Sequence, residues 1–361
     1  LAQKYVFLAA KAYDYETGLL SSDPEAGDSF LRDVVGARSL GVFDAVGHPV
    51  PGGGVGDPGL ADIMARMDAN WLVLKTRLGI NNPQPYATWF SLRKELFRIL
   101  PGPEGDGAWK TELAKYWVDN LLTLPEYRRY CQPFQAIGGL QTQEPGLAIP
   151  FSSTIDFAKN FFGNDLAGED SALDSTYFAT KIAEAGIFFD GYNEKLNGYT
   201  GTAPFALTPT VYLIPIGDDR MRAPGLEDGT VLSYRIVDQV VPLPYTVGST
   251  HLDNPDWMPL YDGYTGGVDL AARIRKYPSF RAYFGAGGTS SAYLDCPRLV
   301  GRSAWNTRWL LIIPAGTLNA NRDDALRTFI NGKDANRDGI VDLSGVTDIR
   351  LGLKTYSHSG N

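Results

Sequence analysis

The stretch DANRDGIVDLSG, residues 334 to 345, carries the side chains best suited to hold an ion. Acidic and amide side chains alternate at its start and are followed by a glycine, which is the order that opens an EF-hand calcium loop. Carboxylate, amide and carbonyl oxygens are the ligands that Ca²⁺ prefers. The predicted calcium ligands are Asp334, Asn336, Asp338, the carbonyl of Ile340, Asp342 and Asp348.

The end of this loop departs from the EF-hand pattern. Position twelve is Gly345, which has no carboxylate, and Asp348 stands three residues later. Asp348 can replace the closing ligand if the chain continues as a strand instead of a helix. The alternative is an Asx-rich solvated turn that leads into the last strand. We expect a calcium site of moderate affinity, because the closing ligand is displaced.

A second candidate is the loop HLDNPDWMPLYDGYTGG, residues 251 to 267, in which aromatic and acidic residues alternate. Flat aromatic rings stack on sugar faces, while carboxylates accept hydrogen bonds from sugar hydroxyls. The alternative is a packed loop that covers one end of a sheet. The possible glycan-binding residues are Asp253, Asp256, Trp257, Tyr261, Asp262 and Tyr264.

Catalytic motifs are absent from the sequence. The three histidines, His48, His251 and His358, do not form HExxH, which excludes the common zinc hydrolase pattern. There is no GxSxG elbow, no Walker loop and no cysteine–histidine signature. A GxGxxG pattern in residues 54–59 contains Pro58, so it predicts a flexible loop. A glycoside hydrolase remains an alternative, because it needs only two facing carboxylates.

Two further charged patterns have structural interpretations. Asp218 and Asp219 follow an apolar run, and we interpret them as a turn. Arg302, Trp305, Arg308 and Trp309 interleave charge with indole rings, which predicts cation–π stacking on the surface of a strand. Pairs of this kind are more often structural than binding.

The cysteines are Cys131 and Cys296, which stand far apart and form no CxxC motif. They fit either one long-range disulfide or two buried thiols. In an oxidising compartment a Cys131–Cys296 bridge would tie the first part of the chain to the second.

The net charge of −8, with no basic block, argues against nucleic acid or an anionic membrane surface as a partner. No stretch approaches the roughly 20 apolar residues that a membrane span needs, so we expect no membrane insertion. The chain begins at Leu1 inside a helical pattern that has no capping residue before it. This start predicts a fragment of a longer precursor.

The hydrophobic period changes along the chain. Apolar residues at three- and four-residue spacing predict helices over 2–16, 28–41, 60–80, 87–100 and 108–122. Apolar and β-branched runs predict strands within 179–192, 209–219, 229–244, 308–316 and 346–356, and 272–284 fits an interrupted helix. The expected fold is α+β: a helical domain over 1–140, then an antiparallel, jelly-roll-like β-sandwich over 141–361.

Long segments of the strand-rich half carry a family resemblance. They resemble the C-terminal region of very large secreted or surface-borne bacterial multidomain proteins, many of which carry laminin-G-like or other jelly-roll modules. The segments are STYFATKIAEAGIFFDGYN, TPTVYLIPIGDDRMRAP, IVDQVVPLP, RLVGRSAWNTRWLLIIPAGTL and VTDIRLGLKTYSHSGN. The opening LAQKYVFLAAKAYDYETG and the join YRRYCQPF are also similar to that region.

A more distant likeness relates ATKIAEAGIFF to a strand in the C-terminal β-sandwich of the A subunit of Tc-type toxin complexes. These resemblances imply fold and location more than activity. We therefore expect a non-catalytic structural, assembly or adhesion module of a bacterial surface or extracellular structure. Its expected partners are copies of itself or other surface proteins. A carbohydrate-binding module that takes glycans is the alternative, and a glycoside hydrolase is the second alternative.

Overall fold

The computed structural model describes residues 2–39, 46, 60–131, 143–171, 173–174, 176–192, 205, 209–224, 229–236, 243–246, 299, 301–333 and 345–359. The helices are α1 (Ala2–Thr17), α2 (Gly27–Ser39), α3 (Leu60–Arg77), α4 (Pro103–Ala114), α5 (Pro125–Tyr130), α9 (Ala315–Leu318) and α10 (Arg322–Asn331), with a π-helical turn η1 (Leu92–Leu96) and a 3-10 turn η2 (Leu121–Thr123). The strands are β1 (Gln84–Ser91), β2 (Trp117–Val118), β3 (Gly146–Phe151), β4 (Phe178–Asp190), β5 (Thr210–Pro215), β6 (Asp219–Arg222), β7 (Val231–Tyr234), β8 (Leu243–Thr246), β9 (Trp305–Asn306), β10 (Trp309–Pro314) and β11 (Asp348–His358).

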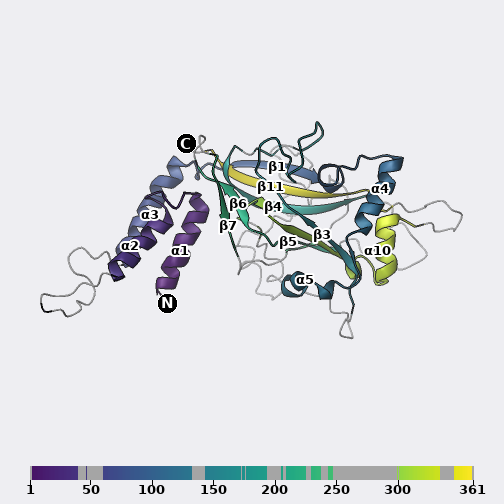
Figure 1. The fold of residues 1–361 in the computed structure, drawn as a ribbon, viewed down its shortest axis with the longest axis horizontal. Coiled ribbons are helices and arrows are strands. Elements are labelled where there is room, and N and C mark those ends of the chain that lie inside the picture. The colour runs from purple at the N-terminus through teal and green to yellow at the C-terminus, as the bar shows by residue number, and fades with distance from the viewer. Residues whose placement is uncertain are drawn as a thin grey trace, which may run out of the picture.

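The described strands form three antiparallel sheets. Their strand orders are β1-β11-β4, β2-β3-β10-β5-β8 and β7-β6-β9. The long strands β1, β11 and β4 run together across the molecule, beside the sheet that contains β3 and β5 (Figure 1). Helices together with antiparallel sheets place the chain in the α+β class, as the sequence predicts.

Strand β10 explains why the sequence WLLIIP is apolar throughout. Successive side chains of a strand point to opposite faces of its sheet. Leu311 and Ile313 enter the main hydrophobic core, which also receives side chains of β1, β4 and β11. Leu310 and Ile312 enter a second core that lies with Tyr127 of α5 on the other face. Both faces of β10 are therefore buried.

Residues 84–91 are a strand, and the prediction of a helix over 87–100 is wrong. The side chains from Gln84 to Thr88 are mostly exposed or half-buried, and Phe90 is buried in the main core. Strand β1 pairs along its length with β11, from Gln84 opposite Ser357 to Ser91 opposite Arg350. The helical spacing was accidental, and pairing with a strand more than 250 residues later overrides it. The later part of the predicted helix forms the short turn η1.

Strand register at β1 depends on a close contact between Trp89 and Gly352. The two residues are opposite each other, and a Cβ on Gly352 would lie 2.2 Å from the indole ring. The same ring meets Phe188 of β4 edge-on, at a centroid distance of 4.4 Å. Glycine is therefore required at 352 so that the indole can cross the sheet.

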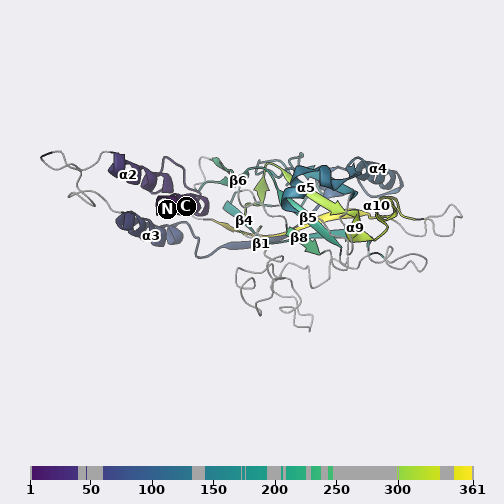
Figure 2. The same ribbon diagram turned by 90° about the horizontal axis from the view of Figure 1, so that it is seen from below.

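Helices α1, α2 and α3 form a helical arm that projects from the sheets and their helices, which we call the β body (Figures 1 and 2). The arm has its own core, in which Tyr13 meets Phe30 and Trp71 edge-on. Phe178 of β4 and Met221 of β6 belong to the same cluster. The arm is therefore packed against the body at its base. The predicted helices over 2–16, 28–41 and 60–80 are confirmed as α1, α2 and α3, and α3 ends slightly earlier than predicted, at Arg77.

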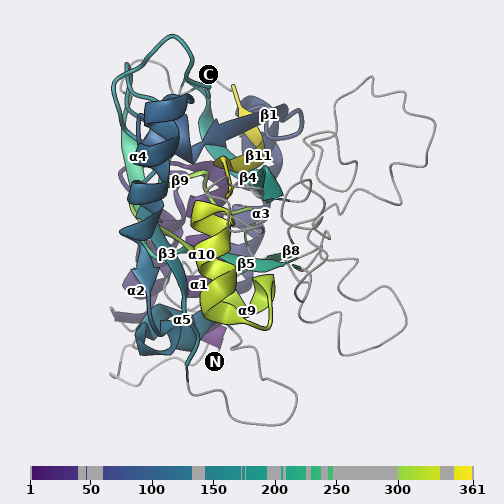
Figure 3. The ribbon, with the colours of Figure 1, turned by 90° about the vertical axis from the view of Figure 1, so that its right-hand side faces the viewer.

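Helices α4 and α10 lie beside each other at the end of the body opposite the arm (Figures 1 and 3). The sequence did not predict α10, because strand signals surround it. Trp109 of α4 is buried and donates its Nε1–H to the carbonyl of Val346 at 2.8 Å. This bond joins α4 to the chain that enters β11.

The remaining predicted helix and strands correspond to structural elements. The helix predicted over 108–122 corresponds to α4, which begins earlier and is shorter than predicted. The strand β2 follows it. The predicted strand regions overlap β4, β5, β7, β8, β10 and β11, whereas β6 was not predicted. The segment 272–284 lies outside the described residues. Strand β1 comes from the first 140 residues and pairs with a strand from the end of the chain. The division at residue 140 stays a prediction.

Candidate functional site

A buried ion pair lies where the helical arm meets the β body. The Asp219 side chain is fully buried at the start of β6, and that of Arg302 is 5% exposed. Arg302 donates from Nε and Nη2 to the two Asp219 oxygens at 2.6 and 2.9 Å. Asn306 of β9 donates its amide to the same carboxylate at 2.7 Å. The charge and hydrogen bonds of Asp219 raise the pKa of Arg302, although burial acts in the opposite direction.

Tyr15 connects this ion pair to the arm. Its hydroxyl donates to Asp219 Oδ2 at 2.9 Å and accepts from the backbone N–H of Ser303 at 2.9 Å. Burial, and next the Asp219 charge, raise the pKa of Tyr15 well above its ordinary value of 10.0. A tyrosine of α1 therefore links the start of β6 to the backbone at Ser303, two segments of the body that are far apart in the sequence.

Lys181 adds a second ion pair to the same joint. Its side chain, on β4, is fully buried, and its Nζ lies 2.7 Å from Glu16 Oε2 on α1. The ammonium also lies 5.0 Å from the centre of the Tyr15 ring. Burial lowers the pKa of Lys181, and the nearby Glu16 charge partly offsets this. We call Tyr15, Glu16, Lys181, Asp219, Arg302, Ser303 and Asn306 the anchor network.

Local sequence explains how Tyr15 and Glu16 reach the body. Helix α1 ends at Thr17, and Gly18 follows with φ +63°, a left-handed conformation that glycine adopts without strain. Asp14, the residue before Tyr15, bonds within the arm: its carboxylate accepts from the N–H of Gly27 at 2.5 Å, at the start of α2. The last turn of α1 is thus bonded to the body on one side and to the arm on the other.

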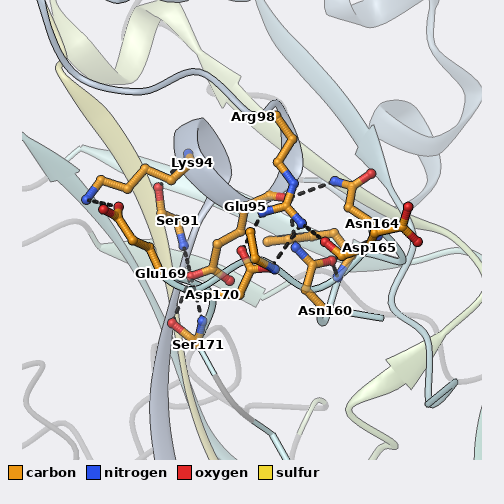
Figure 4. A network of polar contacts seen from close by, with 12 residues as sticks. Ser91, Lys94, Glu95, Arg98, Asn160, Asn164, Asp165, Glu169, Asp170 and Ser171 are labelled. Carbon is orange, nitrogen blue, oxygen red and sulfur yellow. Dashed lines mark hydrogen bonds and ion pairs between the residues drawn. The ribbon is translucent and has the colours of Figure 1, made fainter. Parts of the chain in front are cut away.

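A second polar network surrounds Glu95 in the turn η1 (Figure 4). Glu95 is 3% exposed, and its Oε1 accepts from the hydroxyl of Ser171 at 2.7 Å and from the backbone N–H groups of Ser171 and Ser91. Its Oε2 is buried, with no hydrogen-bond partner in the described part of the chain. Burial raises the pKa of Glu95, and the Ser171 hydrogen bond opposes that shift.

The backbone of η1 is held by amide side chains from a later turn. Asn160 and Asn164 donate to the carbonyl of Glu95 at 2.9 and 2.7 Å, and Asn164 also donates to the carbonyl of Leu96 at 2.9 Å. A π-helical turn leaves such carbonyls without partners in its own segment. The segment around residues 160–164 supplies the missing donors.

Arg98 completes this network. Its φ of +58° is in the left-handed region, which is uncommon for a residue with a side chain. Its guanidinium forms a bidentate pair with Asp170, with N–O distances of 2.5 and 2.9 Å (Figure 4). The Arg98 hydrogen bonds lower the pKa of Asp170 against the opposing effect of burial. We call the residues labelled in Figure 4 the Glu95 network: Ser91, Lys94, Glu95, Arg98, Asn160, Asn164, Asp165, Glu169, Asp170 and Ser171.

The hydrogen bonds of the Glu95 network hold separate segments of the chain together. A carboxyl with a raised pKa beside a serine hydroxyl resembles an acid–base pair in composition. Here, however, the Ser171 hydroxyl and two backbone N–H groups all point at the same oxygen of Glu95. The arrangement fixes the end of β1 to the segment around residue 171.

Asp348, the predicted displaced calcium ligand, lies at the start of β11 and is 9% exposed. Its carboxylate accepts from the Ser91 hydroxyl at 2.6 Å and from the N–H of Arg93 at 3.1 Å. Burial raises the pKa of Asp348. The other predicted calcium ligands, Asp334, Asn336, Asp338, Ile340 and Asp342, lie outside the described residues. The calcium site stays a prediction.

Gly345 has a packing reason for its missing side chain. A Cβ there would lie 2.3 Å from the carbonyl oxygen of Ile330, near the end of α10. The N–H of Val346 donates to the carbonyl of Phe329 at 2.7 Å, and this hydrogen bond holds Gly345 against α10. Gly345 therefore packs closely on the end of α10, which leaves no room for a carboxylate side chain at position twelve. Among the residues that the structure describes, no group of three or more His, Cys, Asp or Glu side chains is arranged to hold a metal.

The other predicted sites are only partly described. The glycan-binding candidates in residues 251–267 lie outside the described residues, as does Cys296. Cys131 is buried, and this burial raises the pKa of its thiol. The disulfide stays a prediction.

The structure corrects two interpretations of charged motifs. Asp219 is not a turn residue, because it begins β6 with its carboxylate buried under Arg302. Arg302 pairs with that carboxylate, while Trp305 and Trp309 are buried in the main core instead of lying on a strand surface. Arg302 lies on Asp219 because a guanidinium that is removed from water needs an opposite charge beside it.

Most residues of the two networks were not predicted from the sequence. One available signal was Lys181, a charged residue inside the apolar run ATKIAEAGIFF. A lysine at such a position predicts a buried ammonium that is paired with an acidic residue. The sequence LRKEL of η1 offered a weaker signal. Its charged residues directly follow the apolar end of β1, and two of them, Arg93 and Glu95, are buried.

No protein-family model, curated protein or solved structure matches this chain. The resemblance to large bacterial surface proteins and to Tc toxins therefore stays a prediction. None of the helices in the described ranges has both the length and the apolar character to cross a membrane.

Proposed function

We propose that this chain is a non-catalytic module that serves in assembly or adhesion within a bacterial surface or extracellular structure. The observation that carries the proposal is the helical arm held on the β body by the anchor network. Buried charges are costly unless they are paired, so a joint built from them has one favoured geometry. A projecting element in a fixed orientation suits a protein that positions other proteins.

The finer architecture proposed for the body is a β-sandwich of the jelly-roll type. The main core receives Phe90 and Leu351 from one sheet and Ile149 and Leu311 from another. Side chains from two sheets that meet in one core support a two-layer arrangement. The acidic balance of the chain and the resemblance of its strand segments support an extracellular or cell-surface location. A Cys131–Cys296 disulfide and bound Ca²⁺ belong to the same proposal.

The test uses antibodies against the chain on cells of the organism that produces it. We expect labelling of intact cells, and chemical cross-linking on those cells should shift the chain into complexes with itself or other surface proteins. Labelling only after permeabilisation would overturn the location. Turnover of a polymeric glycan by the purified chain would overturn the non-catalytic assignment.

A further inference from the structure

Helix α3 has apolar side chains on two faces. Ile63, Met67 and Leu74 are buried in the core of the arm. On the other side Leu72 and Val73 are 52% and 61% exposed. A surface helix that packs against one partner needs only one apolar stripe. This second apolar stripe indicates another partner.

We infer that this partner is a second copy of the chain, and that two α3 helices pack antiparallel about a two-fold axis. The inference rests on the proposed assembly function and names the surface that would perform it. The argument for a second copy comes from the order of side chains along the stripe. Ala65, Ala69, Leu72 and Thr76 follow one another at spacings of four, three and four residues, which is the seam of a coiled coil.

This seam is complementary to itself when it is reversed. In an antiparallel pair centred between Asn70 and Trp71, Leu72 faces the partner's Ala69, and Ala65 faces the partner's Thr76. A large side chain therefore meets a small one in each central layer, which lets the two helices approach closely. Ala65, Ala69 and Thr76 are exposed in the single chain, so the seam is open.

Charges beside the seam fit the same register. Asp68 and Lys75 are seven residues apart and therefore lie on the same flank of the stripe. Like flanks meet in an antiparallel pair, so Asp68 lies opposite the partner's Lys75, and the two-fold axis repeats this contact. A parallel pair would not give this match, because opposite flanks then meet. The order of side chains and charges along α3 thus favours a second copy as the partner and an antiparallel arrangement of the two helices.

The test measures the dimer dissociation constant of the full chain by sedimentation equilibrium. We expect the wild type to dimerise with increasing concentration, and Leu72→Glu to raise the dissociation constant by at least about tenfold, since a carboxylate would be buried against the partner's Ala69. Leu166→Glu is the matched control, because Leu166 is similarly exposed, at 56%, but lies on the β body. It should dimerise as the wild type does.

Charge reversal tests the antiparallel register. Asp68→Lys alone and Lys75→Asp alone each place like charges opposite one another and should weaken the dimer severalfold. The double variant exchanges the two charges and should recover the wild-type dissociation constant. Circular dichroism of each variant checks that the arm is still folded.

Each outcome decides a different question. A wild type that stays monomeric at all concentrations, or a double variant no better than the single ones, overturns the α3 dimer. A dimer that Leu72→Glu leaves unchanged means that the chain associates through another surface, which contradicts this inference but agrees with the proposed function. The cell-surface labelling tests the proposed function without reference to α3.

Discussion

Replacing Asp219 by asparagine removes the negative charge at the centre of the anchor network. The Asp219 carboxylate is fully buried and receives hydrogen bonds from Arg302, Tyr15 and Asn306. The asparagine side chain has nearly the same shape, so packing is kept while the counter-charge of Arg302 is lost. Nη1 of Arg302 is already buried without a hydrogen-bond partner in the described part of the chain.

We expect Asp219→Asn to lower the free energy of unfolding by about 3 kcal/mol, the low end of the range for breaking a buried ion pair. The low end applies because the new amide oxygen can still accept one or two of the hydrogen bonds. Urea denaturation followed by tryptophan fluorescence measures the change, as a shift of the midpoint at an unchanged slope. The double variant Asp219→Leu with Arg302→Met should lose less than the single variant, because no unpaired charge stays buried.

The matched control is Asp165→Asn, the same chemical change in a carboxylate that is 90% exposed and paired with Lys159. It should leave the midpoint unchanged. If Asp219→Asn is also indistinguishable from the wild type, then Asp219 and Arg302 are not paired in a buried joint, and the argument for a fixed arm fails.

Three further predictions concern packing, pH and calcium. Gly352→Ala should destabilise the chain by about 1–3 kcal/mol, because its Cβ would meet the Trp89 ring, and Trp89→Leu in the same chain should recover part of the loss in melting temperature. Burial, and next the charge of Lys181, lower the pKa of His358 below its ordinary 6.5. The folded state therefore favours the neutral imidazole, and the free energy of unfolding should fall as the pH drops through 6.5. His358→Gln should flatten this fall between about pH 7.5 and 5.5, and an equal fall in both proteins would contradict the prediction. Calorimetry should detect Ca²⁺ binding with a dissociation constant of about 10⁻⁴ to 10⁻³ M that Asp338→Ala abolishes, and an unchanged heat signal in the variant would leave the loop as a turn only.

The class of the fold and most of its elements could be predicted from the sequence, because they depend on local patterns. The helices of the arm follow from three- and four-residue apolar spacing, and β10 follows from a short apolar run. Residues 84–91 show the limit of this reasoning. Their spacing fits a helix, but pairing with β11 makes them a strand.

The networks depend on contacts that no local pattern contains. Tyr15 and Asp219 are 204 residues apart in the chain, and Ser91 and Asp348 are 257 apart. Their types are visible in the sequence, but the spacing that matters is a distance in space. The predictions for Asp219 as a turn residue and for Arg302 as a cation–π donor were wrong for this reason.

The sequence by itself determined that helices precede a strand-rich region, that acidic oxygen ligands alternate from Asp334, and that the common catalytic motifs are missing. These follow from periodicity and residue type, which are properties of neighbouring positions. Only the tertiary structure decided that Asp219 and Arg302 are buried together, that Gly345 packs on Ile330, and that α3 keeps a second apolar face exposed. Burial is set by which surfaces meet when distant segments pack, and the free energy of a charge or an apolar side chain depends on that burial.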